Sequence, residues 1–151
     1  MSLLLTIHFL AALVWVGGMF FAHFVLRPSA EALPLPERIK LWTQVLNRFM
    51  RMVWVAVIAL PVSGYWLVFA YYGGMEGLGL HIHLMQGIGW LMILLFFMVY
   101  FGPFKQMKIR EKEALFPEAG MFMLKIRTLV TINLFLGLIT TVVAVAGRFW
   151  Y

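Results

Sequence analysis

Charged residues are absent from four long stretches of this chain, and apolar residues dominate each of them. The uncharged stretches cover residues 1–26, 52–75, 77–104 and 128–147. A helix needs about 20 apolar residues to cross the hydrocarbon core of a bilayer. Because lipid offers no hydrogen-bond partners, each segment must satisfy its own backbone amides, as a helix does. The pattern predicts an all-α fold, a single domain of residues 1–151 with four transmembrane helices at about 3–26, 50–72, 80–102 and 124–147.

The basic residues between these helices predict the orientation of the bundle. Five of them lie in the first connection and six in the third, whereas the second connection, around residues 73–77, has none. Connections rich in lysine and arginine stay in the cytoplasm. We therefore expect both termini and the glycine-rich second connection to face the periplasm. The protein is then a multi-pass protein of a bacterial inner membrane.

Composition excludes several classes of function. Apolar residues make up 64% of the chain and charged residues only 12%, so a soluble enzyme of this length is excluded. The 151 residues include no cysteine, which excludes disulfides, thiolate metal sites and iron–sulfur clusters. The net charge of +6 fits loop orientation and contact with anionic lipid, so we expect the lipid bilayer and no nucleic acid as a partner.

Two histidines fall at a similar depth inside the predicted membrane helices. His8 lies about 9 Å outward of the midpoint of the first helix, and His83 about 12 Å outward of the midpoint of the third. Seven residues after each of them, on the same helical face, stand Trp15 and Trp90. Ionisable groups in a membrane are costly and mark functional sites. We therefore predict that His8 and His83 face each other as the axial ligands of a haem iron.

Small residues on the second helix and a basic residue at the outer end support the haem hypothesis. Ser63 and Gly64 lie at the level of the two histidines, beside Pro61, which we expect to kink the helix. They leave room for a flat group. Arg148 is the basic residue at the outer surface and would pair with a haem propionate.

A copper site is the alternative reading of the same region. The string His81-x-His83-x-Met85 offers imidazole and thioether ligands that suit copper. In a regular helix His81 and His83 point in different directions, so the string chelates copper only if this helix end is frayed. His23 has no histidine partner at its own level, and we interpret it as a hydrogen-bonding or interfacial residue. Asn133 lies on a face of small residues; we assign a packing role to this face and single out Asn133 as the residue on it with a role beyond packing.

Several of these residues resemble the copper resistance protein D-like (CopD) membrane family. The resemblance rests on the segment from His8 through Trp15 to Phe20, and on the pairs Arg48-Phe49 and Ser63-Gly64. The predicted helix at 124–147 adds the pattern Ile126-Arg127-x3-Thr131-x-Asn133-Leu-x-Leu-Gly137. The resemblance covers all four predicted helices and implies a four-helix membrane protein related to copper.

The first helix also resembles that of the HemJ-type haem-b membrane proteins, which are protoporphyrinogen oxidases. The resemblance places His8, Trp15 and Arg27 at that family's haem-linked histidine, tryptophan and arginine. Where that family has a lysine in its third helix, this chain has His83 and Gln86. We therefore do not expect protoporphyrinogen oxidase activity, and a histidine at this place is what a bis-histidine haem requires.

The sequence thus leads to three hypotheses. The first is one b-type haem between the first and third helices in the outer leaflet, which transfers electrons to or from a periplasmic redox partner or a quinone. The second is copper binding or transport through the histidines and methionines of the periplasmic side. The third is an assembly subunit without a cofactor.

Overall fold

The structure is a computed structural model that describes residues 2–150, without the side chains of residues 2 and 148. Within these residues it is helical, with no strand. Four of its helices are long and apolar enough to cross a membrane. In chain order the elements are α1 Ser2–Phe21, the π-helical turn η1 Ala22–Leu26, α2 Arg27–Ala30, α3 Leu35–Tyr71, α4 Leu80–Phe101, α5 Pro103–Lys112, α6 Phe116–Ala146 and the 3-10 turn η2 Gly147–Phe149.

Proline and glycine set the ends of the helices. α3 and α6 each carry a proline in the first turn, where its missing N–H costs no hydrogen bond. Gly102, followed by Pro103, separates α4 from α5. In the connection from α3 to α4, Gly73 and Gly77 have φ values of +73° and +80°, which side chains disfavour. Pro61 lies inside α3, and the helix continues through it.

The helices α3 and α6 extend well beyond the thickness of a bilayer. α3 has 37 residues and α6 has 31, which makes them about 55 Å and about 46 Å long, whereas the hydrocarbon core is about 30 Å thick. Residues 37–46 are part of α3, and residues 105–112 are part of α5, which packs on α6. Both bury apolar side chains within the bundle, among them Trp42 and Met107.

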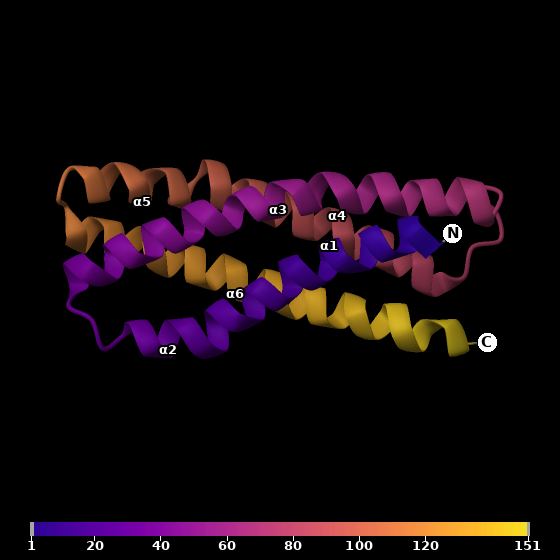
Figure 1. The fold of residues 1–151 in the computed structure, drawn as a ribbon, viewed down its shortest axis with the longest axis horizontal. Helices are drawn as coiled ribbons and strands as arrows, with labels where there is room; N and C mark the ends of the chain where they lie inside the picture. The colour runs from indigo at the N-terminus through magenta and orange to yellow at the C-terminus, as the bar shows by residue number, and fades with distance from the viewer. Residues whose placement is uncertain (1, 151) are drawn as a thin grey trace.

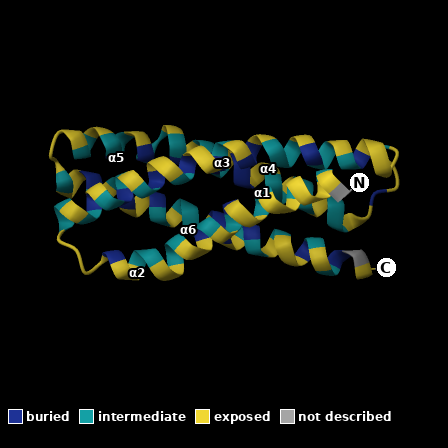
Figure 2. Ribbon diagram, in the orientation of Figure 1, coloured by how far each residue is buried: buried dark blue, intermediate teal, exposed yellow. Residues whose placement is uncertain are grey.

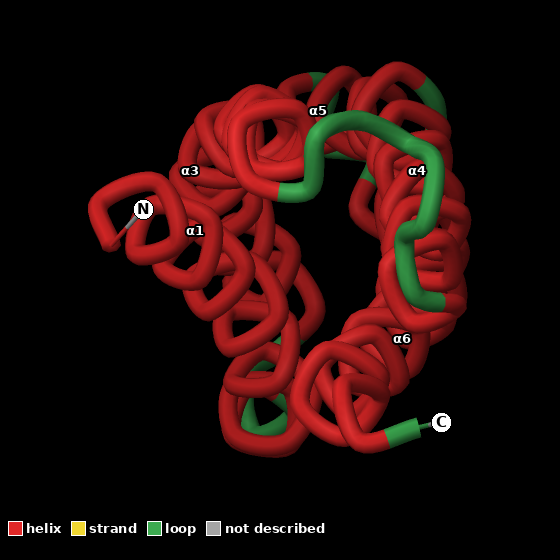
Figure 3. The backbone as a smooth tube through the Cα atoms, turned by 90° about the vertical axis from the view of Figure 1, so that its right-hand side faces the viewer, coloured by secondary structure: helices red, strands yellow, loops and turns green. Residues whose placement is uncertain are grey.

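The helices form a ring in which α1 and α4 lie on opposite sides (Figure 3). α1 packs mainly on α3, and α4 packs mainly on α6. Trp54 of α3 meets Phe96, Phe97 and Tyr100 of α4 with ring centroids 5.4–5.5 Å apart, so aromatic contacts bridge these two helices. The outward faces of the helices are exposed (Figure 2) and apolar, as lipid contact requires.

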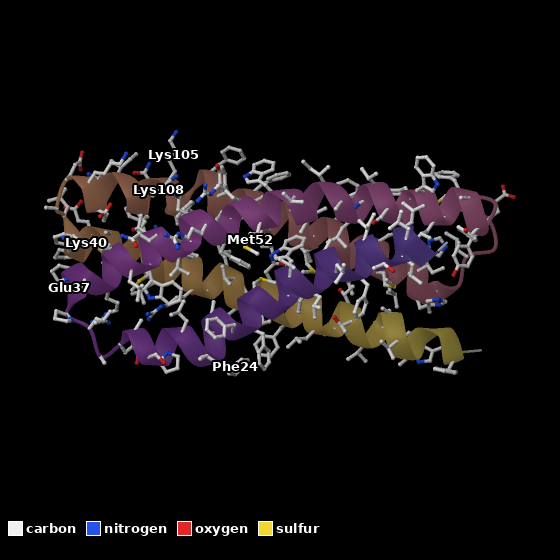
Figure 4. The ribbon with its side chains drawn as sticks, viewed as in Figure 1. Phe24, Glu37, Lys40, Met52, Lys105 and Lys108 are labelled. Atoms are coloured by element: carbon white, nitrogen blue, oxygen red, sulfur yellow. The ribbon has the colours of Figure 1, made fainter. Side chains whose placement is uncertain are left out.

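Both chain ends and the α3–α4 connection lie at one end of the bundle (Figure 1), which we call the outer end. Glu37, Lys40, Lys105 and Lys108 lie toward the other end, the basic end (Figure 4). We expect a reporter fused after Tyr151 to be active in the periplasm, because basic connections are retained in the cytoplasm. The measurement is a paired alkaline phosphatase and fluorescent-protein fusion, and a cytoplasmic C-terminus would overturn the orientation.

Candidate functional site

His8 of α1 is bonded to α3 at the level where Ser63 and Gly64 lie. Its Nδ1 is 2.8 Å from Ser63 Oγ, and that hydroxyl donates to the carbonyl oxygen of Ala59 at 2.5 Å. His8 Nδ1–H is then the donor to Ser63 Oγ. A β-carbon on Gly64 would stand 3.2 Å from His8 Cε1, so glycine lets the imidazole approach α3. The structure therefore brings together His8, Ser63 and Gly64.

We expect Ser63→Ala to destabilise the protein by about 1–3 kcal/mol, because it leaves the half-buried His8 Nδ1 without its partner. Ser29→Ala is the matched control, since Ser29 makes the same kind of bond to a carbonyl four residues back but is exposed. Unfolding of both variants in detergent is the measurement. Equal loss of stability in the two would show that the His8 bond contributes nothing.

The other residues of the haem hypothesis lie elsewhere in the bundle. His83 is exposed on α4. Trp90 is 52% exposed and donates to Tyr65 Oη at 3.0 Å, whereas Trp15 is buried and meets Phe96 edge to face. The side chain of Arg148 lies outside the described residues. α1, which carries His8, and α4, which carries His83, lie on opposite sides of the ring (Figure 3). A haem shared by the two histidines stays a prediction.

His81, not His83, is the histidine of α4 that packs against the end of α6. A β-carbon on Gly147 would overlap the Cβ of His81, and one on Gly79 would stand 2.6 Å from His81 Cε1. Both glycines therefore make room for this imidazole between the beginning of α4 and the end of α6. α4 is helical from Leu80, and in a regular helix His81 and His83 point in different directions, so chelation by the string His81-x-His83-x-Met85 stays a prediction.

The face of α4 that carries His81 also carries two thioethers. At 3.6 residues per turn, Met85 and Met92 lie within about 40° and about 20° of His81 around the helix. Met92 is 4% exposed, and its methyl group would be 3.1 Å from a β-carbon on Gly137 of α6. We call this line of contact between α4 and α6, from His81 at the outer end to Met92 in the core, the seam.

Asn133 of α6 closes the inner part of the seam. Its Nδ2 donates to the carbonyl oxygen of Met92 at 3.3 Å, and the residue is 5% exposed. Its Oδ1 is buried without a hydrogen-bond partner. An unpaired buried oxygen costs free energy, and a passing cation is one group that would satisfy it.

The sequence analysis included His81 and Met85 in the copper alternative but not Met92 or Asn133, and it therefore missed the inner part of the seam. The signal for it was the spacing of four and eleven residues between His81, Met85 and Met92, which places them on one helical face. Across the described residues, no three His, Asp or Glu side chains gather as a metal site. The seam offers imidazole, thioether and amide groups, a donor set in which sulfur favours Cu(I).

Comparison with known proteins identifies the family. The family model described as Copper resistance protein D matches residues 43–147 of this chain. The matched segment includes every residue of the seam and excludes His8. Searches of curated proteins and of solved structures gave no match. Because the match spans more than half of the 151 residues, the chain belongs to the copper resistance protein D family.

Proposed function

We propose that this membrane protein carries copper, as Cu(I), from its outer end into the bundle along the seam. The observation that supports this most is that His81 and Met92, on one face of α4, both pack against the end or the middle of α6. Helical geometry puts Met85 on the same face of α4. The imidazole stands at the outer end, and the buried thioether of Met92 lies in the core.

The chemistry of these groups suits a monovalent soft ion. Thioether sulfur and neutral imidazole prefer Cu(I) over hard cations such as Mg²⁺ and Ca²⁺. Each site offers few ligands, so each holds the ion weakly, and a chain of weak sites allows an ion both to enter and to leave. Asn133 Oδ1 adds an oxygen at the level of Met92.

Buried thioethers continue beyond the seam. Met19 of α1, Met50 of α3 and Met123 of α6 are between 2% and 4% exposed, so all four long helices contribute a buried sulfur to the core. Methionine also fills core space well, so burial alone does not distinguish a ligand from a packing group. The test must therefore change sulfur chemistry and keep the packing.

Met92→Leu is such a change, because leucine and methionine have similar volumes. In vesicles that contain purified protein and an internal Cu(I) chelator, we expect this variant to slow copper entry about tenfold, the effect of losing about 1.4 kcal/mol of ion binding. Met98→Leu is the control, since Met98 lies on the same helix and is 50% exposed.

Two outcomes would contradict the proposal. One is copper entry no faster with the wild-type protein than in vesicles without protein. The other is an equal effect of Met92→Leu and Met98→Leu. A Soret band in the purified protein that His8→Ala abolishes would favour the haem hypothesis instead.

A further inference from the structure

A cavity of about 50 Å³ lies toward the basic end of the bundle, between η1, α3 and α6. Its volume admits one or two water molecules, or one small anionic group, and is far too small for a haem. Residues of four elements, η1, α2, α3 and α6, line it, and most of its accessible surface is apolar. The polar lining consists of His23, Arg27, Trp42, Arg127 and Thr131.

Three buried donors on residues that line the cavity have no acceptor. Nε and Nη2 of Arg127 are buried without a hydrogen-bond partner, and so is Nε1 of Trp42. Trp42 is 6% exposed, and the side chain of Arg127 is 15% exposed. Donors left unpaired in a buried place are costly, because water no longer satisfies them. All three are donors, so the group that would satisfy them is an acceptor with several oxygens.

Positive charge around the cavity exceeds negative charge. Arg27 and Arg38 lie within electrostatic range of Arg127, and Glu31 is the acidic group in the same range. Glu31 reaches Arg127 Nη1 at only 4.0 Å. Three guanidinium groups therefore face one carboxylate, and Arg38 also has a buried Nε without a partner. An anion would reduce this imbalance.

Sequence and structure together place the cavity at the boundary of the apolar layer. Arg27 is the first charged residue after the uncharged segment 1–26, and Arg127 is the last before the uncharged segment 128–147. Lipid phosphates lie at this boundary. His23 Nδ1 lies 3.2 Å from Thr131 Oγ1, so a bond between α6 and η1 closes one wall, and Leu46 and Val130 supply apolar surface.

We propose that this cavity binds one phosphate group, held by Arg127, Arg27 and the indole N–H of Trp42. A guanidinium group donates to phosphate through two parallel N–H bonds, and the indole adds a third direction. An anionic phospholipid of the leaflet at the basic end carries such a phosphate at the level of the cavity. Free phosphate offers the same oxygens without the acyl chains. The experiment below distinguishes binding of a phospholipid from binding of free phosphate.

The experiment measures the melting temperature of the purified full-length protein in a neutral detergent. The probes are dihexanoyl phosphatidylglycerol, dihexanoyl glycerol (which has the same chains and no phosphate) and inorganic phosphate at constant ionic strength. A ligand at a hundredfold excess over its Kd should raise the melting temperature by about 5–10 °C. We expect this shift with phosphatidylglycerol and not with dihexanoyl glycerol.

Three variants locate the effect. Arg127→Gln should abolish the shift, whereas Arg48→Gln should retain it, because Arg48 is exposed on α3 and does not line the cavity. Trp42→Phe keeps the ring and removes an unpaired donor. It should reduce the shift without lowering the melting temperature of the protein free of ligand, so it remains informative if Arg127→Gln does not fold.

The outcomes distinguish the possible ligands. If inorganic phosphate raises the melting temperature as much as phosphatidylglycerol does, and the same variants lose this shift, the cavity is a phosphate site whose ligand is free phosphate. A shift found only with phosphatidylglycerol makes lipid the ligand. The proposal is overturned if dihexanoyl glycerol raises the melting temperature as much as phosphatidylglycerol does. It is also overturned if Arg48→Gln loses as much of the shift as Trp42→Phe or Arg127→Gln.

Discussion

Gly137→Leu should prevent the bundle from assembling, whereas Gly87→Leu should leave it intact. A β-carbon at position 137 would stand 2.7 Å from Val16 Cγ2 of α1 and 3.1 Å from Met92 Cε of α4, so a larger side chain must push three helices apart. A β-carbon on Gly87 meets nothing within 4 Å. Helices in lipid associate through close packing at small residues, so this separation removes the main attraction between them.

We expect Gly137→Leu to lower the free energy of unfolding by more than about 3 kcal/mol, the upper part of the range for overpacked cores. Unfolding in mixed detergent and sodium dodecyl sulfate, followed by circular dichroism and size-exclusion chromatography, measures this change. If both leucine variants unfold at the wild-type detergent fraction, α6 does not approach α1 and α4 as the structure has it.

His81→Ala should weaken Cu(I) binding about tenfold or more, and His83→Ala should leave it unchanged. The two histidines are two residues apart on one helix, but His81 packs against Gly147 whereas His83 is exposed. Loss of one nitrogen ligand from a site of few ligands costs at least about 1.4 kcal/mol, which is tenfold in affinity. Competition between the purified protein and a chromogenic Cu(I) chelator measures the affinity.

Met85→Leu should weaken copper binding in the same assay, because it removes a sulfur four residues from His81 on the same face and keeps the apolar volume. The His83→Ala protein controls for the general loss of a histidine near the outer end. A drop in affinity with His83→Ala that matches the drop with His81→Ala would mean that copper binds on the exposed face of α4 and not in the seam.

The fold could be predicted from the sequence because charge and apolarity mark the membrane segments directly. The uncharged segment 77–104 contains all of α4, and 128–147 contains most of the outer part of α6. The helical extensions at the basic end were harder to predict. Residues 37–46 have the amphipathic pattern of an interfacial helix, and only tertiary contacts show that this pattern faces α5 and α6.

The faces of α4 could not be predicted from the sequence. This helix is apolar on all sides, so periodicity does not distinguish the side that packs on α6 from the side that faces lipid. Depth along the helix suggested pairing His83 with His8, but depth carries no information about direction around the axis. The glycines at 79 and 147, which admit His81, become meaningful only when α4 and α6 are placed side by side.

The seam begins at the outer end of the bundle, whereas the cavity lined by Arg27 and Arg127 lies toward the basic end. A copper ion that leaves at the basic end must pass near Arg27 and Arg127, which repel cations. A phosphate bound in that cavity would reduce the repulsion. Copper entry into vesicles of phosphatidylglycerol should then exceed entry into vesicles whose lipids carry no net charge.

X-ray absorption at the copper K-edge of the protein loaded with a single equivalent of Cu(I) tests whether copper binds in the seam. We expect a site of low coordination number with both nitrogen and sulfur neighbours. The nitrogen contribution should be lost in His81→Ala, and the sulfur contribution should be reduced in Met85→Leu. A copper site with nitrogen or oxygen neighbours alone, unchanged by both substitutions, would contradict it.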